Sequence, residues 1–571
     1  MLTNRLASAA LVLLVCTILL TACRAEAQEP VTFYGWSKYD IPTLDPQLAD
    51  DTISVGVVEN LFLQLTNYDP HTAQIVPEAA NRWEISPDGL TYTFHLRTDV
   101  PWVKHNPTIG STTQEVDAQG NPRFLTAHDF VYGIRRACDP NTGSYYSTVV
   151  APQIKSCQDV LFYQDPEHIP QALWDAVGVY APDDQTLVIQ LEFPASYFLS
   201  MTPLWTLAAV PHWVVEEHGQ EWIKPANVVT NGRFVLDEWK TDARRVFLRN
   251  PLIPDDLHGA GNVQRLVFDV IQDCETGYAL WLDNKVDASC IPHEQMQTHR
   301  ERFPDETDRV AELAVNYISF RMTKPPFDDP RVRRAFSAAF DRATFVQEVL
   351  QGQGIPMIHF APPGIFGAPP VDEVGLGFDL QFARQQLAAA GYPDCQGFPR
   401  VTLINFGERD TPAKYAQAQW VANLGCSPDQ ILIKQMAFGE LLRVTDSEAP
   451  DSSAPHMWML GWTADYADEN NWVGDVLWCK TPTRQKRTCN EIDELIVRAR
   501  QETDPQRRIQ LYRQIEELFF GPQGEIPFIP IYAGMSYTAR HTWLELTHPP
   551  FGGEQWYTWS IDPEAQQAAR H

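Results

Sequence analysis

The chain has 571 residues and a formal net charge of −29, from 73 acidic and 44 basic side chains. This acidity, without any basic tract, argues against a nucleic-acid partner, because the phosphates would be repelled. Hydrophobic residues make up 44% and charged residues 20%, which is typical of a globular protein and excludes a largely disordered chain.

The first 22 residues are typical of an export signal. A single charge, Arg5, precedes an apolar stretch at about 7–20 that is short for a membrane span. The stretch ends in Leu-Thr-Ala-Cys at 20–23, which looks like a bacterial lipobox. Lipidation of Cys23 would anchor the mature chain on the outer face of a membrane. A plain signal peptide followed by a chance cysteine is the alternative.

Eight cysteines follow this segment, and an even number in an exported chain indicates disulfides. Eight cysteines allow about 105 connectivities. Their clustering favours four consecutive pairs, with separations of 19, 16, 31 and 10 residues, and free buried thiols are the alternative. No CxxC occurs, so zinc or thioredoxin-like chemistry has little support. The eight are Cys138, Cys157, Cys274, Cys290, Cys395, Cys426, Cys479 and Cys489.

Strand and helix patterns alternate through the middle of the chain. Residues 89–97 and 186–191 alternate apolar and polar side chains, which predicts two half-buried strands. Between them, 126–137 predicts a helix with a capping-box start. Another helix begins at Asp329-Pro330, with Asp as the cap and Pro at the first helical position. Its expected core stripe is Val332, Phe336, Phe340, Ala343 and Val346.

Two units of helix followed by strand occupy the second half, which indicates a parallel or mixed sheet. Both helices end at a glycine, and a pair of polar-faced helices broken at Asp504-Pro505 comes later. The predicted elements are helix 378–390, strand 400–405, helix 413–424, strand 431–435 and the helix pair 490–520.

Catalytic and metal motifs are missing from the sequence. We find no GxSxG, GxxxxGK, HExxH or GxGxxG. His212 and His218 have no matching third ligand, and the acidic run 465–469 lacks the ligand spacing of a calcium loop. A carboxylate pair for glycoside hydrolysis stays open, because separations in space are invisible in sequence. We therefore expect no metal and no cofactor.

One ordered set of segments does indicate a function. The segments are Leu44-Asp45-Pro46, Ile75 to Ala80, Trp83 to Arg97, Thr126 to Tyr132, Val228 to Phe234, Arg249-Asn250-Pro251, Lys324 to Arg333 and Gly461 to Tyr466. Together they closely resemble the extracellular solute-binding proteins of family 5, the oligopeptide- and dipeptide-binding receptors of ABC importers. The resemblance covers nearly the whole mature chain.

This resemblance implies an α/β fold of the periplasmic-binding-protein type, with two lobes and an additional N-terminal domain. The lobes would close around a ligand by a hinge motion. After the signal peptide at 1–22, lobe one would comprise 23–69, 204–314 and 545–571, the extra domain 70–203, and lobe two 315–544.

The resemblance also implies a ligand site. In the oligopeptide binders an Asp after a Gly-Trp-x-Ala stretch pairs with the ligand's α-ammonium, and Asp465 occupies that position. The backbone of Gly461 to Thr463 would pair with an extended peptide, and Trp462 would supply an apolar wall. The alternative is that Asp465 caps the following segment and Trp462 belongs to the core.

Two departures from the family pattern bear on the ligand. Some relatives join this strand to the opposing lobe by a disulfide, and the two positions align with Ala314 and Thr463. Some carry a basic residue shortly before the Gly-Trp, where this chain has Met-Trp-Met-Leu at 457–460. Peptide length, and peptide identity itself, therefore stay open, because other members bind sugars, nickel complexes or other solutes.

The sequence thus predicts a binding receptor and not an enzyme. It would be a monomer that captures an oligopeptide in the periplasm or at the cell surface and delivers it to an ABC permease. Its only membrane contact would be the lipid anchor. A non-peptide solute such as an oligosaccharide is the runner-up ligand. A secreted hydrolase, or a receptor that signals or acts as a chaperone, is the remaining alternative.

Overall fold

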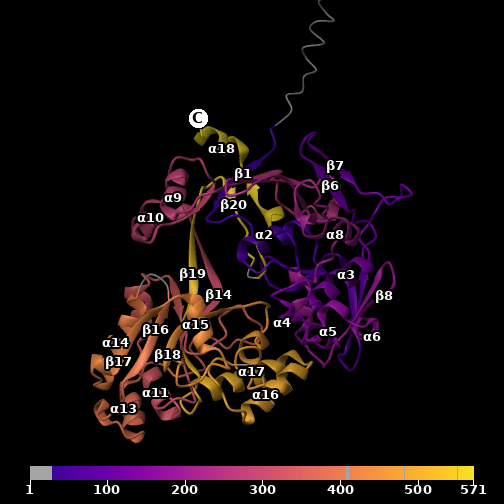
Figure 1. Ribbon diagram of the computed structural model, residues 1–571. Coiled ribbons are helices and arrows are strands. Elements are labelled where there is room, and N and C mark those ends of the chain that lie inside the picture. Colours follow the sequence, from indigo (N-terminus) through magenta and orange to yellow (C-terminus); the bar gives the residue numbers. More distant parts are fainter. Residues whose placement is uncertain (1–28, 407–409, 481–482, 550, 571) are drawn as a thin grey trace, which may run out of the picture.

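The computed structural model describes residues 29–406, 410–480, 483–549 and 551–570. The predicted signal peptide and Cys23 lie outside the described residues. The described chain forms two bodies, and two long strands pass between them (Figure 1). No helix in these ranges is long and apolar enough to cross a membrane.

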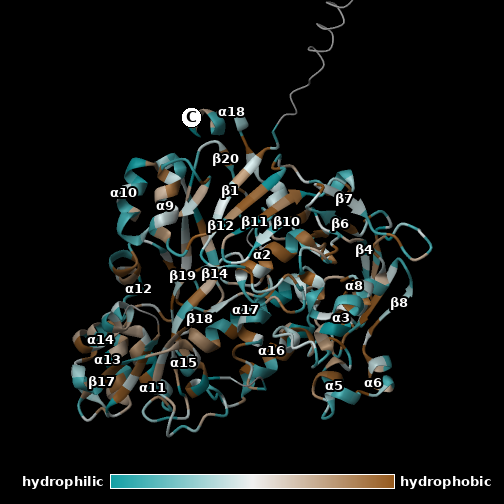
Figure 2. Cartoon of the chain, turned by 45° about the horizontal axis from the view of Figure 1, so that its top comes forward, coloured by the Kyte–Doolittle hydropathy of each residue, from teal (hydrophilic) through white to brown (hydrophobic). Residues whose placement is uncertain are grey.

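The upper body of Figure 1 contains a four-stranded sheet with the order β1-β12-β11-β10. β1 and β12 are parallel and the other pairs are antiparallel. Hydrophobic residues concentrate in these strands, whereas the outer helices α10 (Met296–Arg302) and α18 (Pro563–Arg570) are largely hydrophilic (Figure 2). The strands are β1 Thr32–Ser37, β10 Phe234–Lys240, β11 Arg244–Arg249 and β12 Arg265–Val270.

The C-terminal segment returns to this body. Asp287 is fully buried, and its carboxylate accepts hydrogen bonds from the Tyr34 backbone N–H, from Gln566 and from Arg570 at 2.8–2.9 Å. The buried Asp287 carboxylate therefore connects β1 with α18. The short strands β20 (Leu544–Glu545) and β21 (Ser560–Ile561) pair nearby.

A second four-stranded sheet within 80–190 has the order β4-β5-β9-β8, with β4 at Ala80–Ile85 and β8 at Val179–Asp183. The predicted strands are β5 (Thr91–Leu96) and β9 (Thr186–Gln190), and they pair antiparallel. The predicted helix is α3 (Ala127–Cys138), whose Thr126 backbone N–H donates to Asp129 Oδ2 at 2.9 Å, as in a capping box. Buried residues of both four-stranded sheets form one continuous hydrophobic cluster, so the two sheets of the upper body share one core.

The lower body is built on a mixed sheet, as the helix-then-strand pattern predicts. β16 (Val401–Phe406) runs parallel to β17 (Ile431–Met436) and to β18 (Met457–Thr463). Its helices are α11 (Pro330–Ala338), α13 (Leu380–Ala389), α14 (Thr411–Leu424), α15 (Phe438–Thr445), α16 (Glu491–Gln501) and α17 (Pro505–Phe520).

One part of the predicted core stripe is wrong. α11 ends at Ala338, and the Asp341 carboxylate starts a new short helix, α12 (Arg342–Thr344), by accepting from the Thr344 backbone N–H at 3.0 Å. The break changes the rotation of the chain, so Ala343 is exposed although Val346 is buried.

The two bodies are connected by β14 (Thr307–Phe320) and β19 (Phe528–Arg540), which run side by side (Figure 1). Their pairing register shifts between Ala311 and Val315. A break in the ladder removes local hydrogen bonds and permits bending. We therefore propose that the lobes hinge here, at the expected boundary 314/315, and we keep the other expected domain bounds as a proposal.

The structure places each consecutive pair of cysteines at bonding distance, with Sγ–Sγ separations of 1.97–2.03 Å. Among the described residues, the one group of three candidate metal ligands is Cys479, Cys489 and Asp493. These two sulfurs bond each other, so this group is not a metal site.

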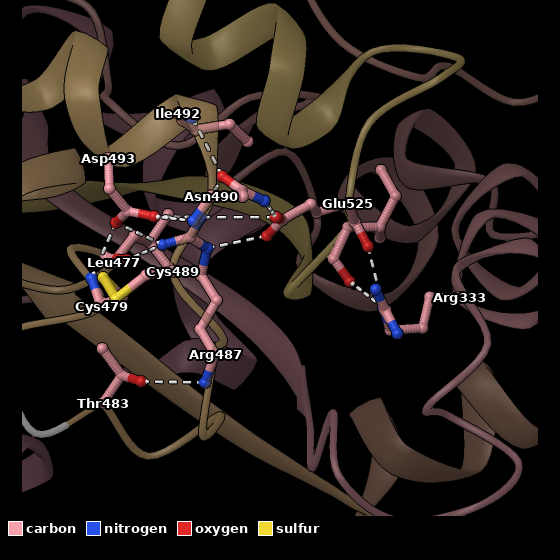
Figure 3. A network of polar contacts seen from close by, with 11 residues as sticks. Arg333, Leu477, Cys479, Thr483, Arg487, Cys489, Asn490, Ile492, Asp493 and Glu525 are labelled. Atoms are coloured by element: carbon pink, nitrogen blue, oxygen red, sulfur yellow. Dashed lines mark hydrogen bonds and ion pairs between the residues drawn. A yellow bond between two sulfur atoms is a disulfide. The ribbon is translucent and has the colours of Figure 1, made fainter.

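A buried ion network holds the start of α16 (Figure 3). The Arg487 side chain has no exposed surface, and it donates to Asp493 Oδ1 and to Glu525 Oε2, each at 2.7 Å. Asp493 also accepts from the Cys479 backbone N–H at 2.9 Å. One guanidinium thus joins the disulfide loop, α16 and the segment before β19.

Candidate functional site between the two bodies

The segment 461–465 lies at the end of β18, next to the strands that connect the bodies. Gly461 pairs with Asn316, Trp462 with Val315 and Thr463 with Ala314, all on β14. The positions aligned with the family disulfide are thus opposite each other in one sheet. In this chain neither position carries a cysteine, and the two residues face each other on the neighbouring strands β14 and β18.

Among the described residues, the other edge of β18 is unpaired beyond its first two residues. In the described part of the chain, β16 pairs with β18 only at Met457 and Trp458. Within the described ranges, the backbone of 459–463 therefore has a sheet partner only on the β14 side. An unpaired strand edge is a template for an added strand.

Asp465 follows this open edge and has no cationic partner among the described residues. Its Oδ2 accepts from Asn471 Nδ2 at 3.1 Å, and its backbone N–H donates to Asn471 Oδ1 at 2.9 Å. The carboxylate is half-buried, and burial, followed by the nearby Asp475, raises its pKa to about 6. Placing an ammonium group beside it would offset this unfavourable environment.

The opposite wall comes from the upper body. The Tyr146 hydroxyl, at the start of α4 (Ser147–Val150), donates to Asp465 Oδ1 at 3.3 Å. The Tyr146 ring meets Trp205 edge-on, with centroids 4.7 Å apart, and Tyr145 beside it is 71% exposed. Asp465 and Tyr146 thus face each other across the boundary between the bodies.

The loop that carries Asp465 is fixed by the residues after it. Tyr466 is buried and stacks on Tyr197 of the upper body, with centroids 5.6 Å apart. Its hydroxyl donates to Asp475 Oδ2 at 2.7 Å. Asp468 is paired with the buried Arg508, so the acidic run 465–469 is not a set of free oxygen ligands for calcium.

The alternative interpretation, that Asp465 is a cap and Trp462 a core residue, agrees with the structure only in part. The Asp465 side chain bonds Asn471 inside the loop, but it caps no helix. Trp462 is half-buried and donates from Nε1 to Asn471 Oδ1 at 3.1 Å. Thr463 is exposed to solvent, and the Asn316 side chain lies close to Gly461.

Sequence reasoning did not find Tyr146 or Asn471 as members of this site. Tyr146 lies 319 residues before Asp465, so only the packing of the two bodies brings them together. His212 and His218 both lie on α8 (His212–His218), where His212 approaches Asp129 at 3.6 Å and His218 approaches Glu217 at 3.9 Å.

Two α/β lobes joined by a pair of long strands are the arrangement of a solute-binding protein that closes on its ligand. Comparison with known proteins identifies the kind. Residues 74–479 match the family model described as bacterial extracellular solute-binding proteins, family 5 Middle. The chain belongs to this family and is a solute-binding receptor of the type that serves ABC importers.

The relatives match this chain over most of their own length. The probable deoxycholate-binding periplasmic protein YgiS of Escherichia coli (strain K12) is 30% identical, over 88% of each chain. The periplasmic oligopeptide-binding protein OppA of Salmonella typhimurium is 26% identical, over 86% of this chain and 85% of its own. The solved structure of MppA, the periplasmic murein tripeptide binding protein in its unliganded open form, has the same fold, with a TM-score of 0.75 at 24% identity over 93% of this chain and 98% of that one.

Proposed function

We propose that the protein captures oligopeptides through their amino terminus and hands them to an ABC permease. The observation that carries the proposal is Asp465, a half-buried carboxylate without a cationic partner in the described chain, directly after an open strand edge. A peptide lying along 459–463 as an added strand brings its α-ammonium to Asp465 and Tyr146. Backbone pairing is indifferent to side chains, so many sequences fit.

The ligand's other end is less constrained. Residues 457–460 offer no cation for a peptide carboxylate, so we propose that this strand does not fix peptide length. The names of OppA and MppA, which bind oligopeptides and a murein tripeptide, support a peptide. The name of YgiS, with deoxycholate, supports a non-peptide solute as the second candidate.

The role needs binding alone, and we propose no catalysis. Closure of the lobes expels water and strengthens the contact between an ammonium and Asp465, because the local dielectric falls. We further propose export by the signal at 1–22, a lipid anchor on Cys23 outside the membrane, oxidised cysteine pairs and a monomeric receptor. A secreted hydrolase would instead turn over substrate.

Selective retention of free amino termini tests the peptide proposal. Purified protein is incubated with a mixture of short peptides, half of it acetylated at the amino terminus, and the bound fraction is identified by mass spectrometry. We expect the free peptides to be retained and the acetylated ones to be lost, because acetylation removes the charge that Asp465 binds. Equal retention of both halves would contradict the assignment of Asp465.

A further inference from the structure

A pair of buried carboxyl groups lies next to the loop that carries Asp465. Glu469 ends the acidic run of this loop, and Glu516 lies on α17. Both side chains are fully buried, and Glu516 is within hydrogen-bonding reach of Glu469. The peptide site at Asp465 makes no use of either acid.

Glu516 has hydrogen-bond donors, whereas Glu469 has none. The Glu516 carboxylate accepts from the backbone N–H groups of Phe360 and Ala361 at 2.9–3.2 Å. Neither carboxyl oxygen of Glu469 has a hydrogen-bond partner among the described residues. Buried polar groups are normally satisfied, and an ionised Glu469 would be a buried charge without a donor. One proton changes this, because a protonated Glu469 can donate to Glu516.

The cation that α17 places near Glu469 is paired with another acid. Arg508 binds Asp468, and the Asp468 carboxylate also accepts from the Tyr512 hydroxyl at 3.0 Å. Burial, followed by the charges of Glu516 and Asp468, raises the pKa of Glu469 well above its usual value. Arg508 acts in the opposite direction, with a smaller effect.

The titratable groups on the other neighbouring elements do not compensate Glu469. Arg500 of α16 approaches Asp475 at 3.8 Å. His359, in the segment after β15 (Gly354–Pro356), is fully buried near Glu516. Burial lowers the pKa of His359, so its ring is neutral at pH 7. Glu469 is therefore held more favourably as the neutral acid than as the carboxylate.

The backbone of Glu469 connects it to the residue that holds Asp465. Its carbonyl accepts two backbone N–H groups of the helical turn Asn470–Gly474, at 3.0 and 3.1 Å. Asn471 in this turn makes two hydrogen bonds with Asp465. The Glu469 backbone N–H donates to the Phe366 carbonyl at 2.9 Å. A displacement of Glu469 would therefore move the turn that positions Asp465.

We propose that Glu469 and Glu516 share one proton at neutral pH, and that this proton keeps the Asp465 loop in its binding position. Loss of the proton at alkaline pH leaves two buried negative charges beside each other, which repel and displace Glu469. Asn471 and Asp465 move with it. The effect on peptide capture rests on the proposed function, whereas the shared proton and the loop movement do not.

Infrared difference spectroscopy detects the proton without any ligand, because a protonated carboxyl group has a C=O band that a carboxylate lacks. We expect this band in the difference between the unmodified protein and Glu469→Gln at neutral pH. Glu494→Gln, which changes an exposed acid on α16, is expected to give no such band. A Glu469 difference spectrum without the band would overturn the proposal.

Glu516→Gln removes the acid that shares the proton. Its amide oxygen can still accept from the Phe360 and Ala361 backbone N–H groups, and its NH2 group can donate to an ionised Glu469. We expect the band to be lost in this variant as well. A band that persists in Glu516→Gln would contradict sharing between the two acids.

Thermal unfolding at two pH values gives an independent result. Because the native pKa of Glu469 lies above its ordinary value of 4.5, stability falls as the pH rises from 4.5 toward the native pKa. Glutamine is neutral throughout and can donate as the protonated acid does. Glu469→Gln is therefore expected to raise the thermal midpoint at pH 8 and to leave it nearly unchanged at pH 4. A lower midpoint at pH 8, or equal changes at both pH values, would overturn the proposal.

Hydrogen exchange over 465–473, followed by mass spectrometry, tests the movement of the loop. At pH 9 we expect faster exchange in the unmodified protein than in Glu469→Gln, since only the unmodified protein can lose the shared proton. Equal exchange would contradict a loop held by this proton. None of these measurements uses a peptide, so their failure is distinct from a failure of the proposed function.

Discussion

Asp465→Asn lowers the affinity for a peptide with a free amino terminus by about 2–5 kcal/mol, the cost of removing one partner from a buried charge pair. Asparagine keeps the size, and its amide oxygen can still accept from Asn471 Nδ2 while its NH2 group donates to the Tyr146 hydroxyl oxygen, so the loop retains both contacts. Titration calorimetry measures the loss. Asp255→Asn, whose side chain is fully exposed in lobe one, serves as the matched control and is expected to bind like the unmodified protein.

The same variant is expected to be at least as stable as the unmodified protein without ligand. Burial raises the native pKa of Asp465 from 3.8 to about 6, so the native state binds the proton more tightly than the unfolded chain between these values. Stability is therefore lost as the pH rises through this window, and the cost persists at neutral pH. Asparagine removes that cost. A lower thermal midpoint together with weaker binding would indicate misfolding and not loss of the ammonium contact.

Peptide affinity is also expected to fall as the pH drops below about 6, because protonated Asp465 no longer attracts an ammonium group. In Asp465→Asn this pH dependence disappears.

Arg487→Met lowers the free energy of unfolding by about 3–5 kcal/mol, because it leaves the carboxylates of Asp493 and Glu525 without their shared cation. Both pairs are at 2.7 Å, and the guanidinium has no exposed surface (Figure 3). Urea denaturation followed by circular dichroism measures the change.

An exposed ion pair in the same lobe supplies the control for Arg487. Arg513 and Glu373 pair with 49% and 48% of their side chains exposed, so Arg513→Met is expected to cost less than about 1 kcal/mol. Equal losses in the two variants would contradict the importance of the buried network.

Local signals were enough to predict much of the lower body. Gly425 ends α14 in the left-handed region, at φ +80°, and Asp504 caps α17 just before its first-turn proline. These glycine, aspartate and proline signals act over a few residues, so sequence reveals them directly. Ala343 was misplaced because a cap at Asp341 restarts the helix, and periodicity alone does not register such a restart.

Sequence reasoning predicted only some of the residues at the candidate site. Asp465 was found through a resemblance, not through its chemistry, because nothing in an acidic run shows which carboxylate lacks a partner. The contact of Tyr146 with Asp465 depends on packing between segments that lie far apart in the sequence. In such places the residue types are ordinary, and only their surroundings indicate a role.

Native mass spectrometry of a soluble form that begins after Cys23 tests the central claim most directly. The intact protein is weighed, and whatever it carries is released by denaturation and identified. Our account predicts a heterogeneous set of peptides, all with free amino termini, that is absent from Asp465→Asn prepared in parallel. A single non-peptide solute, retained equally by both proteins, would keep the receptor fold but contradict peptide capture through Asp465.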